Sequence, residues 1–260
     1  MLYILIALMG ASIGSFINVV SVRLNNGENF ISTRSHCPNC GHILHFWDLI
    51  PLFSYLYLRG CCRYCHHKIG GRYYFIEVFV SLLFVLVALL KGPLDILGFF
   101  FCSFLVLIAL MDIDSYEVDL RVLLLLLLFE IILSSQTWEE RIFSMIIGFL
   151  FYGLIKSLGH FIWKEEAFGM GDVYFLTSLG IIFSPTQIIF VGLLSFVCGG
   201  VFCSIWYLFF SLKERSTKIP FTPFISTSAI ITYLFSIRYT LINILHGKSA
   251  PFKKDFVSLW

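Results

Sequence analysis

The chain has 260 residues, of which 58% are hydrophobic and only 13% are charged, with a formal net charge of +2. Average soluble domains contain about 25% charged residues, so this composition excludes a disordered chain, a small disulfide-rich secreted protein and an ordinary soluble enzyme. The low charge predicts that much of the surface faces lipid. Because no basic patch accompanies the small net charge, we expect no nucleic-acid partner.

Eight apolar segments have roughly the length of a helix that crosses a hydrocarbon core of about 30 Å. They are residues 2–22, 73–91, 94–112, 120–136, 138–160, 172–184, 186–211 and 224–245. Only Ser184-Pro185 separates the sixth segment from the seventh, so seven spans remain an alternative. In the first segment, Gly10 and Gly14 have the spacing that allows close helix contact. We expect an all-α polytopic membrane protein with about eight transmembrane helices.

Three parts are expected in chain order: a first transmembrane helix at 1–22, a polar loop at 23–72 and a multi-span core at 73–260. Lys and Arg residues concentrate in the loops on the side that contains residues 23–72. The positive-inside rule therefore predicts that this loop is cytosolic, in a protein of the cell inner or cytoplasmic membrane.

The polar loop contains two Cys-x-x-Cys pairs, Cys37 with Cys40 and Cys62 with Cys65. Paired knuckles at this separation are typical of zinc ribbons, in which four thiolates close a tetrahedron around a structural Zn²⁺. The alternative is two disulfides or a redox pair, which a reducing cytosol disfavours. Cys61 is a second candidate ligand, although its spacing to Cys65 is less suitable. The sequence thus predicts a zinc-ribbon-like loop between the first and second spans.

Carboxylates follow two of the predicted spans. The third span ends at Asp112-Ile113-Asp114, and the fifth is followed by Gly169-Met170-Gly171-Asp172. Both places lie at the cytoplasmic face in the expected topology, and ionisable groups at spans are frequently functional. Two carboxylates that share a proton can activate water for peptide hydrolysis. From spacing alone, ordinary acidic caps of loops remain an alternative.

Helix ends suggest different roles for the two carboxylates. Asp172 at a helix N-terminus is favoured as the anion and base, whereas Asp112 near a helix C-terminus is favoured as the acid. Gly169 and Gly171 are expected to let a peptide backbone approach.

Together, these motifs resemble the type IV prepilin peptidase family, the membrane aspartyl proteases with a Gly-x-Gly-Asp motif. The resemblance covers nearly the whole chain and keeps the order of its motifs. They are Gly14-Ser15-Phe16-Ile17-Asn18 with Arg23, Trp47-Asp48-Leu49-Ile50-Pro51, Tyr73 with Glu77, the run from Asp112, Gly169–Asp172 and Pro220-Phe221-Thr222-Pro223-Phe224.

The resemblance implies an endopeptidase that cuts the leader of prepilin or pseudopilin proteins on the cytoplasmic side, after Gly and before an apolar helix in the same bilayer. It assigns catalysis to Asp112 and Asp172, rather than to the neighbouring Asp114. Many members with the four-cysteine loop also methylate the new N-terminus with S-adenosylmethionine, which the sequence leaves open here. The alternative is a transporter, or a pilus or secretion assembly scaffold with a zinc docking loop.

Four positions depart from the family pattern. Asp119 and Tyr74 stand where Pro is usual, Tyr174 replaces a Lys, and Thr222 replaces a Gly. None removes a carboxylate of the predicted pair, but each lies where helix geometry near the site could change.

Overall fold

Helices form nearly all the regular structure of the computed structural model, which describes residues 1–27, 34–134, 136–163, 169–209 and 219–245. Outside the cysteine loop they are α1 (Leu2–Asn25), α3 (Arg72–Leu90), α4 (Ile96–Ser115), α5 (Leu120–Leu133), α6 (Trp138–Trp163), α7 (Met170–Leu179), α8 (Pro185–Phe209) and α9 (Thr222–Leu245). The loop carries a 3₁₀ helix, η1 (Phe46–Leu49), and the short α2 (Phe53–Tyr57). The expected all-α fold is confirmed, and the sixth and seventh segments are separate helices.

Five of these helices, α1, α3, α4, α6 and α8, are long and apolar enough to cross a membrane. By contrast, α7 has 10 residues and therefore extends only about 15 Å. Backbone groups in the turn after α7 still need partners, because lipid offers none. Ser134 donates a hydrogen bond to the Ile181 carbonyl at 2.6 Å, and the Gln136 amide donates one to the Ile182 carbonyl at 2.7 Å. These contacts satisfy an irregular segment inside the bundle.

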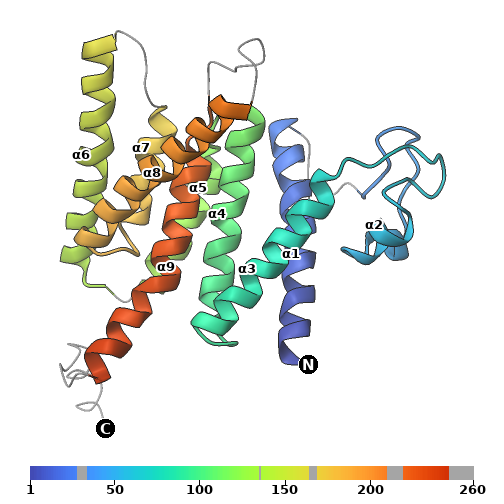
Figure 1. The fold of residues 1–260 in the computed structure, drawn as a ribbon, viewed down its shortest axis with the longest axis horizontal. Helices are drawn as coiled ribbons and strands as arrows, with labels where there is room; N and C mark the ends of the chain where they lie inside the picture. Colours follow the sequence, from blue (N-terminus) through green and yellow to red (C-terminus); the bar gives the residue numbers. More distant parts are fainter. Residues whose placement is uncertain (28–33, 135, 164–168, 210–218, 246–260) are drawn as a thin grey trace.

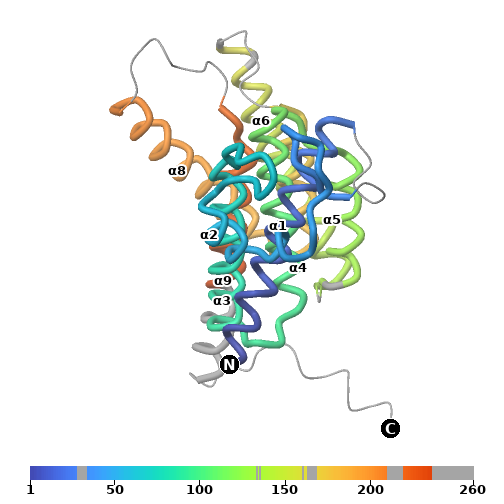
Figure 2. Tube along the Cα trace, turned by 90° about the vertical axis from the view of Figure 1, so that its right-hand side faces the viewer, coloured from blue at the N-terminus to red at the C-terminus, as the bar shows by residue number. Residues whose placement is uncertain are grey.

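The central helix is α4, which packs against α1, α3, α5 and α9. Helices α6, α7 and α8 form the neighbouring part of the bundle, with α6 against both α7 and α8 (Figures 1 and 2). The start of α1 and the end of α9 lie on one side of the molecule (Figure 1). The cysteine loop, the end of α4 and the start of α7 lie on the other, which places the predicted site residues on one face.

Close contact between α1 and α3 depends on glycine, as the sequence predicts. A Cβ atom on Gly10 would lie 2.9 Å from the Ser81 Cα atom, and one on Gly14 would lie 3.1 Å from the Ile76 carbonyl oxygen. Real Cβ atoms essentially never show the first of these distances and rarely show the second, so a larger residue at Gly10 would force the helices to shift, and one at Gly14 would require its neighbours to move by a few tenths of an ångström. The two glycines thereby fix α1 onto the core.

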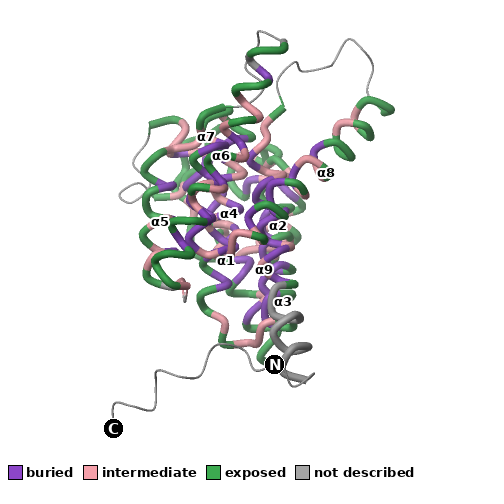
Figure 3. The backbone as a smooth tube through the Cα atoms, turned by 90° about the vertical axis from the view of Figure 1, so that its left-hand side faces the viewer, coloured by how far each residue is buried: buried purple, intermediate pink, exposed green. Residues whose placement is uncertain are grey.

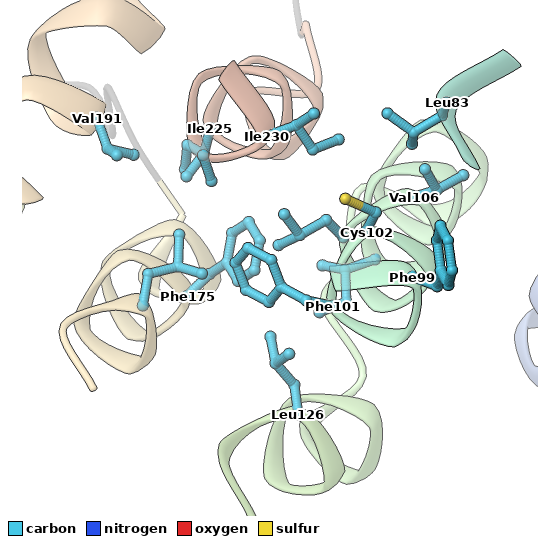
Figure 4. Packing of buried hydrophobic residues seen from close by; sticks show 14 of the residues in the cluster. Leu83, Phe99, Phe101, Cys102, Val106, Leu126, Phe175, Val191, Ile225 and Ile230 are labelled. Carbon is cyan, nitrogen blue, oxygen red and sulfur yellow. The ribbon is translucent and has the colours of Figure 1, made fainter. Parts of the chain in front are cut away.

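Large apolar side chains fill the centre of the bundle. Phe101 from α4, Leu126 from α5 and Phe175 from α7 are completely buried and point toward one another (Figure 4). The outer faces of the helices are also apolar but exposed (Figure 3), as at Leu150 and Leu154 of α6. Exposed apolar surface of this extent is typical of a protein whose outer face meets lipid.

Candidate active site and metal centre

Asp112 and Asp172 come together at one residue, although they are far apart in the sequence. Asp112 lies in the last turn of α4 and Asp172 in the first turn of α7, and both are buried. The backbone N–H of Thr222 donates a hydrogen bond to Asp112 Oδ2 at 3.0 Å. Its hydroxyl donates another to Asp172 Oδ1 at 2.9 Å. Thr222 therefore bridges the two carboxylates that the sequence singles out.

The position of Thr222 at the start of α9 explains this bridge. The first N–H groups of a helix have no partner within the helix, so one is free to bind Asp112. The N-terminal ends of α7 and α9 both meet the end of α4 here, and their dipoles favour negative charge. Sequence reasoning noticed Thr222 only as a departure from the family pattern. The flanking Pro220 and Pro223 were the available signal that this segment has a fixed geometry.

The two glycines before Asp172 have different surroundings. A Cβ atom on Gly171 would lie 3.2 Å from the Val118 side chain, in the connection between α4 and α5. Glycine here lets the start of α7 approach the segment that follows Asp112. Among the residues that the structure describes, a Cβ atom on Gly169 would meet Asp172 Oδ2 at 3.7 Å and the Gly171 nitrogen at 3.9 Å, which are ordinary van der Waals contacts.

Asp114, the nearest competitor of Asp112, is an anchor. Both of its oxygens accept hydrogen bonds from the Arg72 guanidinium at the start of α3, one of them at 2.6 Å. The Ser21 hydroxyl of α1 donates to the same carboxylate at 2.9 Å. With these contacts Asp114 joins the ends of three helices, and both of its oxygens accept hydrogen bonds from structural partners.

The departures from the family pattern are accommodated locally. Asp119 caps α5, since its carboxylate accepts a hydrogen bond from the Arg121 N–H. The Arg121 side chain also binds this carboxylate and lowers the pKa of Asp119. Tyr74 stacks on Tyr55 of α2 with ring centroids 5.2 Å apart. Tyr174 is half-exposed on α7.

The four predicted cysteines form one cluster in the loop. All Sγ atoms of Cys37, Cys40, Cys62 and Cys65 lie within 4.8 Å of one another. Tetrahedral zinc with Zn–S bonds of about 2.3 Å places its sulfurs about 3.8 Å apart, and Cys37 and Cys65 are 3.8 Å apart. The residues present fit a four-thiolate metal site. Cys61 lies outside this cluster, as the spacing predicts.

Both knuckles have the same backbone pattern. The Gly41 N–H donates to the Cys37 carbonyl at 2.8 Å, and the His66 N–H donates to the Cys62 carbonyl at 3.0 Å. Both Gly41 and His66 adopt positive φ angles, of 68° and 55°. The backbone N–H of His67 binds the Cys65 sulfur and is the main reason that the pKa of this thiol is lowered to about 6. At Cys65 the knuckle backbone thus favours the thiolate form that metals bind, whereas burial and the neighbouring thiols raise the pKa of Cys40 to about 11.

Known proteins match the chain along most of its length. Residues 8–90 match the family model described as Bacterial Peptidase A24 N-terminal domain, and residues 99–204 match the Type IV leader peptidase family. The cysteines fall within the first range, and both Asp112 and Asp172 fall within the second. No solved structure matches the chain.

Three relatives are named prepilin leader peptidase/N-methyltransferase. The one from Burkholderia pseudomallei (strain 1026b) is 30% identical over 82% of this chain and 71% of the relative. The one from Bacillus subtilis (strain 168) is 27% identical over 88% of this chain and 92% of the relative. The one from Myxococcus xanthus (strain DK1622) is 32% identical over 66% of this chain, which spans about half of that longer protein.

Proposed function

We propose, because the chain belongs to the type IV leader peptidase family, that it is a membrane-embedded aspartyl endopeptidase that cleaves the leader of type IV prepilin-like proteins after Gly. The observation that supports this most directly is the bridge from Thr222 to Asp112 and Asp172. A transporter or an assembly scaffold does not need two carboxylates held by one residue, so that alternative is disfavoured.

The chemistry follows from two carboxylates that hold one proton between them. The ionised aspartate takes a proton from water as the water oxygen attacks the scissile carbonyl carbon. The protonated aspartate donates its proton to the carbonyl oxygen. Collapse of the tetrahedral intermediate then breaks the C–N bond: the leaving amine takes the proton from the aspartate that deprotonated the water, and the other aspartate takes back a proton from a hydroxyl of the intermediate. Since Thr222 gives one hydrogen bond to each of Asp112 and Asp172, it holds both carboxylates in place for these steps.

A mostly apolar pocket between α6 and the start of α7 suits the substrate. Its volume is about 710 Å³, and its lining includes Leu150 and Leu154 of α6 and Met170 and Val173 of α7, with Lys156 and Ser157 as polar members. A prepilin leader precedes an apolar helix, and we assign this pocket to that helix. We infer that the peptide next to the cut approaches Asp172 at Gly169, which has no side chain to obstruct it.

The proposed function also implies a location for the protein and a role for the cysteine loop. We propose an inner or cytoplasmic membrane protein with its cutting site on the cytoplasmic side, where Lys and Arg concentrate. We keep the division into the first helix (1–22), the zinc loop (23–72) and the peptidase core (73–260). Cys37, Cys40, Cys62 and Cys65 would hold a structural Zn²⁺, which gives a loop without a core of its own a fixed shape.

A cleavage assay with a co-expressed prepilin tests the peptidase assignment. Asp112→Asn and Asp172→Asn should each slow leader removal by about 10²- to 10⁴-fold, the usual range for loss of a general acid or base. Glu117→Gln, which changes an exposed carboxylate in the neighbouring connection, should cleave like the wild type. Cleavage at the wild-type rate by either Asp variant would contradict the assignment.

The second activity named for the relatives, N-methyl transfer, is also proposed for this chain. The new N-terminal amine would accept the methyl group of S-adenosylmethionine, which would leave as S-adenosylhomocysteine, and the amine would give up one proton. Mass spectrometry of a pre-cleaved pilin peptide, incubated with the Asp112→Asn variant and S-adenosylmethionine, should show one added methyl group. If the peptide stays unmodified although the loop is folded, the methyltransferase proposal is wrong and the peptidase proposal is unaffected.

A further inference from the structure

The cysteine loop exposes large apolar side chains that no part of the described chain covers. Phe46 and Trp47 of η1 are 76% and 70% exposed, and Tyr57 of α2 is 80% exposed. Phe53 and Leu56 of α2 are each 60% exposed. We call these five side chains the aromatic surface. A patch of this kind on an otherwise polar loop marks an interaction site.

Two contacts fix η1 and α2, so the aromatic surface has a defined direction. Asp48 of η1 forms an ion pair with Arg63 of the second knuckle at 2.7 Å. Tyr55 of α2 stacks on Tyr74 in the first turn of α3. The two short helices also contact each other. Their polar or stacked residues therefore face the protein, while the aromatic surface faces away from it.

The depth of α2 relative to the spans is the decisive observation. The backbone N–H of Leu52, just before α2, donates a hydrogen bond to Glu77 Oε2 at 2.8 Å. Glu77 is five residues into a helix that is long enough to span the membrane, which corresponds to about 7.5 Å along its axis. Figure 1 likewise shows α2 level with α1 and α3 rather than beyond their ends. The aromatic surface thus lies beside the first turns of a span.

The surface of α3 next to α2 is itself apolar and exposed. Phe75 is 72% exposed, and Phe79 and Leu82 continue this face along the helix. Phe75 also lies edge-on to Tyr74, with ring centroids 6.2 Å apart. Through the stacked pair of Tyr55 and Tyr74, α2 is thus attached beside an exposed apolar face of α3. Exposed Arg59 and Lys68 in the same loop suit anionic headgroups.

We propose that the aromatic surface of η1 and α2 is immersed in the lipid leaflet on the side of the cysteine loop. Trp and Tyr prefer the boundary between headgroups and acyl chains, and short amphipathic segments lie in this plane. The immersion fixes the cysteine loop against the membrane instead of leaving it free in solution. Helices α1 and α3 lie between α2 and the helices that carry Asp112 and Asp172 (Figure 1), so this surface is separate from the cutting site.

Lipid-dependent quenching of Trp47 tests this proposal in the full-length protein. Trp138, Trp163, Trp206 and Trp260 are replaced by Phe, and the protein is placed in nanodiscs of phosphatidylcholine and phosphatidylglycerol. Lipids brominated near the top of the acyl chains should quench Trp47 strongly, whereas aqueous iodide should quench it weakly. Metal content measured on the same sample reports whether the loop is folded.

The matched control moves the fluorophore within the loop. In the same background, Trp47→Phe with Tyr64→Trp puts the indole in the second knuckle, where iodide should quench it at least about twofold more than Trp47. Equal iodide quenching at both sites, without quenching by brominated lipid, would overturn the proposal. A change at Trp47 seen only after a prepilin is added would also overturn it, in favour of a substrate surface.

A second measurement needs no substitution. A photoactivatable fatty acid in the bilayer should label wild-type protein within residues 46–57 as well as in the spans. Labelling confined to the spans would contradict immersion of the aromatic surface, whatever the folding of the tryptophan variants.

Discussion

The carboxylate site and the cysteine cluster lie on the same side of the bundle but are built in opposite ways. The cluster comes from one short stretch, in which each knuckle positions its own thiols. The carboxylate site comes from the ends of three helices, and Thr222 is 110 residues from Asp112 along the chain. The first site depends on local backbone geometry, and the second depends on the packing of the whole core.

The strongest test of this difference removes the metal site. Cys37→Ser with Cys65→Ser should abolish metal binding, because only two of the four thiols remain. Structural zinc contributes on the order of 10 kcal/mol to the folding of such loops, so the loop should also lose its folded structure. Limited proteolysis should then cut within residues 34–71, while α4 to α9 stay resistant. Cys61→Ser is the matched control and should keep its metal, since Cys61 lies outside the cluster. Unchanged metal content in the double variant would refute the site.

The next test concerns the bridge in the carboxylate site. Thr222→Val keeps the backbone N–H that binds Asp112 but removes the hydroxyl that binds Asp172. A hydrogen bond to a charged group contributes about 1.5–3 kcal/mol, so leader cleavage should slow by about ten- to a hundredfold. Metal content should not change.

Two controls make this result specific. Thr222→Ser keeps the hydroxyl and should restore most of the cleavage. Thr227→Val removes a hydroxyl on the same helix that binds only the Pro223 carbonyl, and it should cleave like the wild type. If Thr222→Val also cleaves like the wild type, the bridge has no role in the reaction.

Thr222 also marks the limit of what the sequence can predict. The eight helices follow from apolar length, and the cluster of four cysteines follows from spacing, because both signals are local. The pair Asp112 and Asp172 could be selected through its motifs. The sequence could not predict that a single residue, Thr222, binds both carboxylates. That arrangement depends on how α9 packs against α4 and α7.

The same reason explains two further features that were not predicted. Gly171 is expected to admit a peptide, and its packing against Val118 of the neighbouring connection is a further contact that the sequence does not show. The sequence makes Asp114 the nearest competitor of Asp112, and it does not show the contacts of Asp114 with Arg72 and Ser21. In each case a contact between distant segments gives the residue its surroundings, and no local pattern encodes it.

A smaller effect is expected where the two regions connect. Asp114→Asn weakens the contact with Arg72, which links the end of α4 to the segment that leaves the cysteine loop. A partly exposed ion pair contributes about 0–1 kcal/mol. Cleavage should therefore fall less than about tenfold, with a small decrease in Tm. A loss as large as that of Asp112→Asn would assign Asp114 to the catalytic pair instead of to an anchor.

The smallest effect tests whether the cluster responds to local geometry alone. His66 has a positive φ angle where the first knuckle has Gly41, and a side chain in this conformation costs about 1 kcal/mol. His66→Gly should therefore tighten metal binding by roughly fivefold in a competition with a chelator, without any change in cleavage. His67→Gly, at the next position and without a positive φ angle, should not tighten it. Equal or weaker binding by His66→Gly would show that contacts outside the knuckle stabilise the cluster. The cluster would then resemble the carboxylate site in depending on distant contacts.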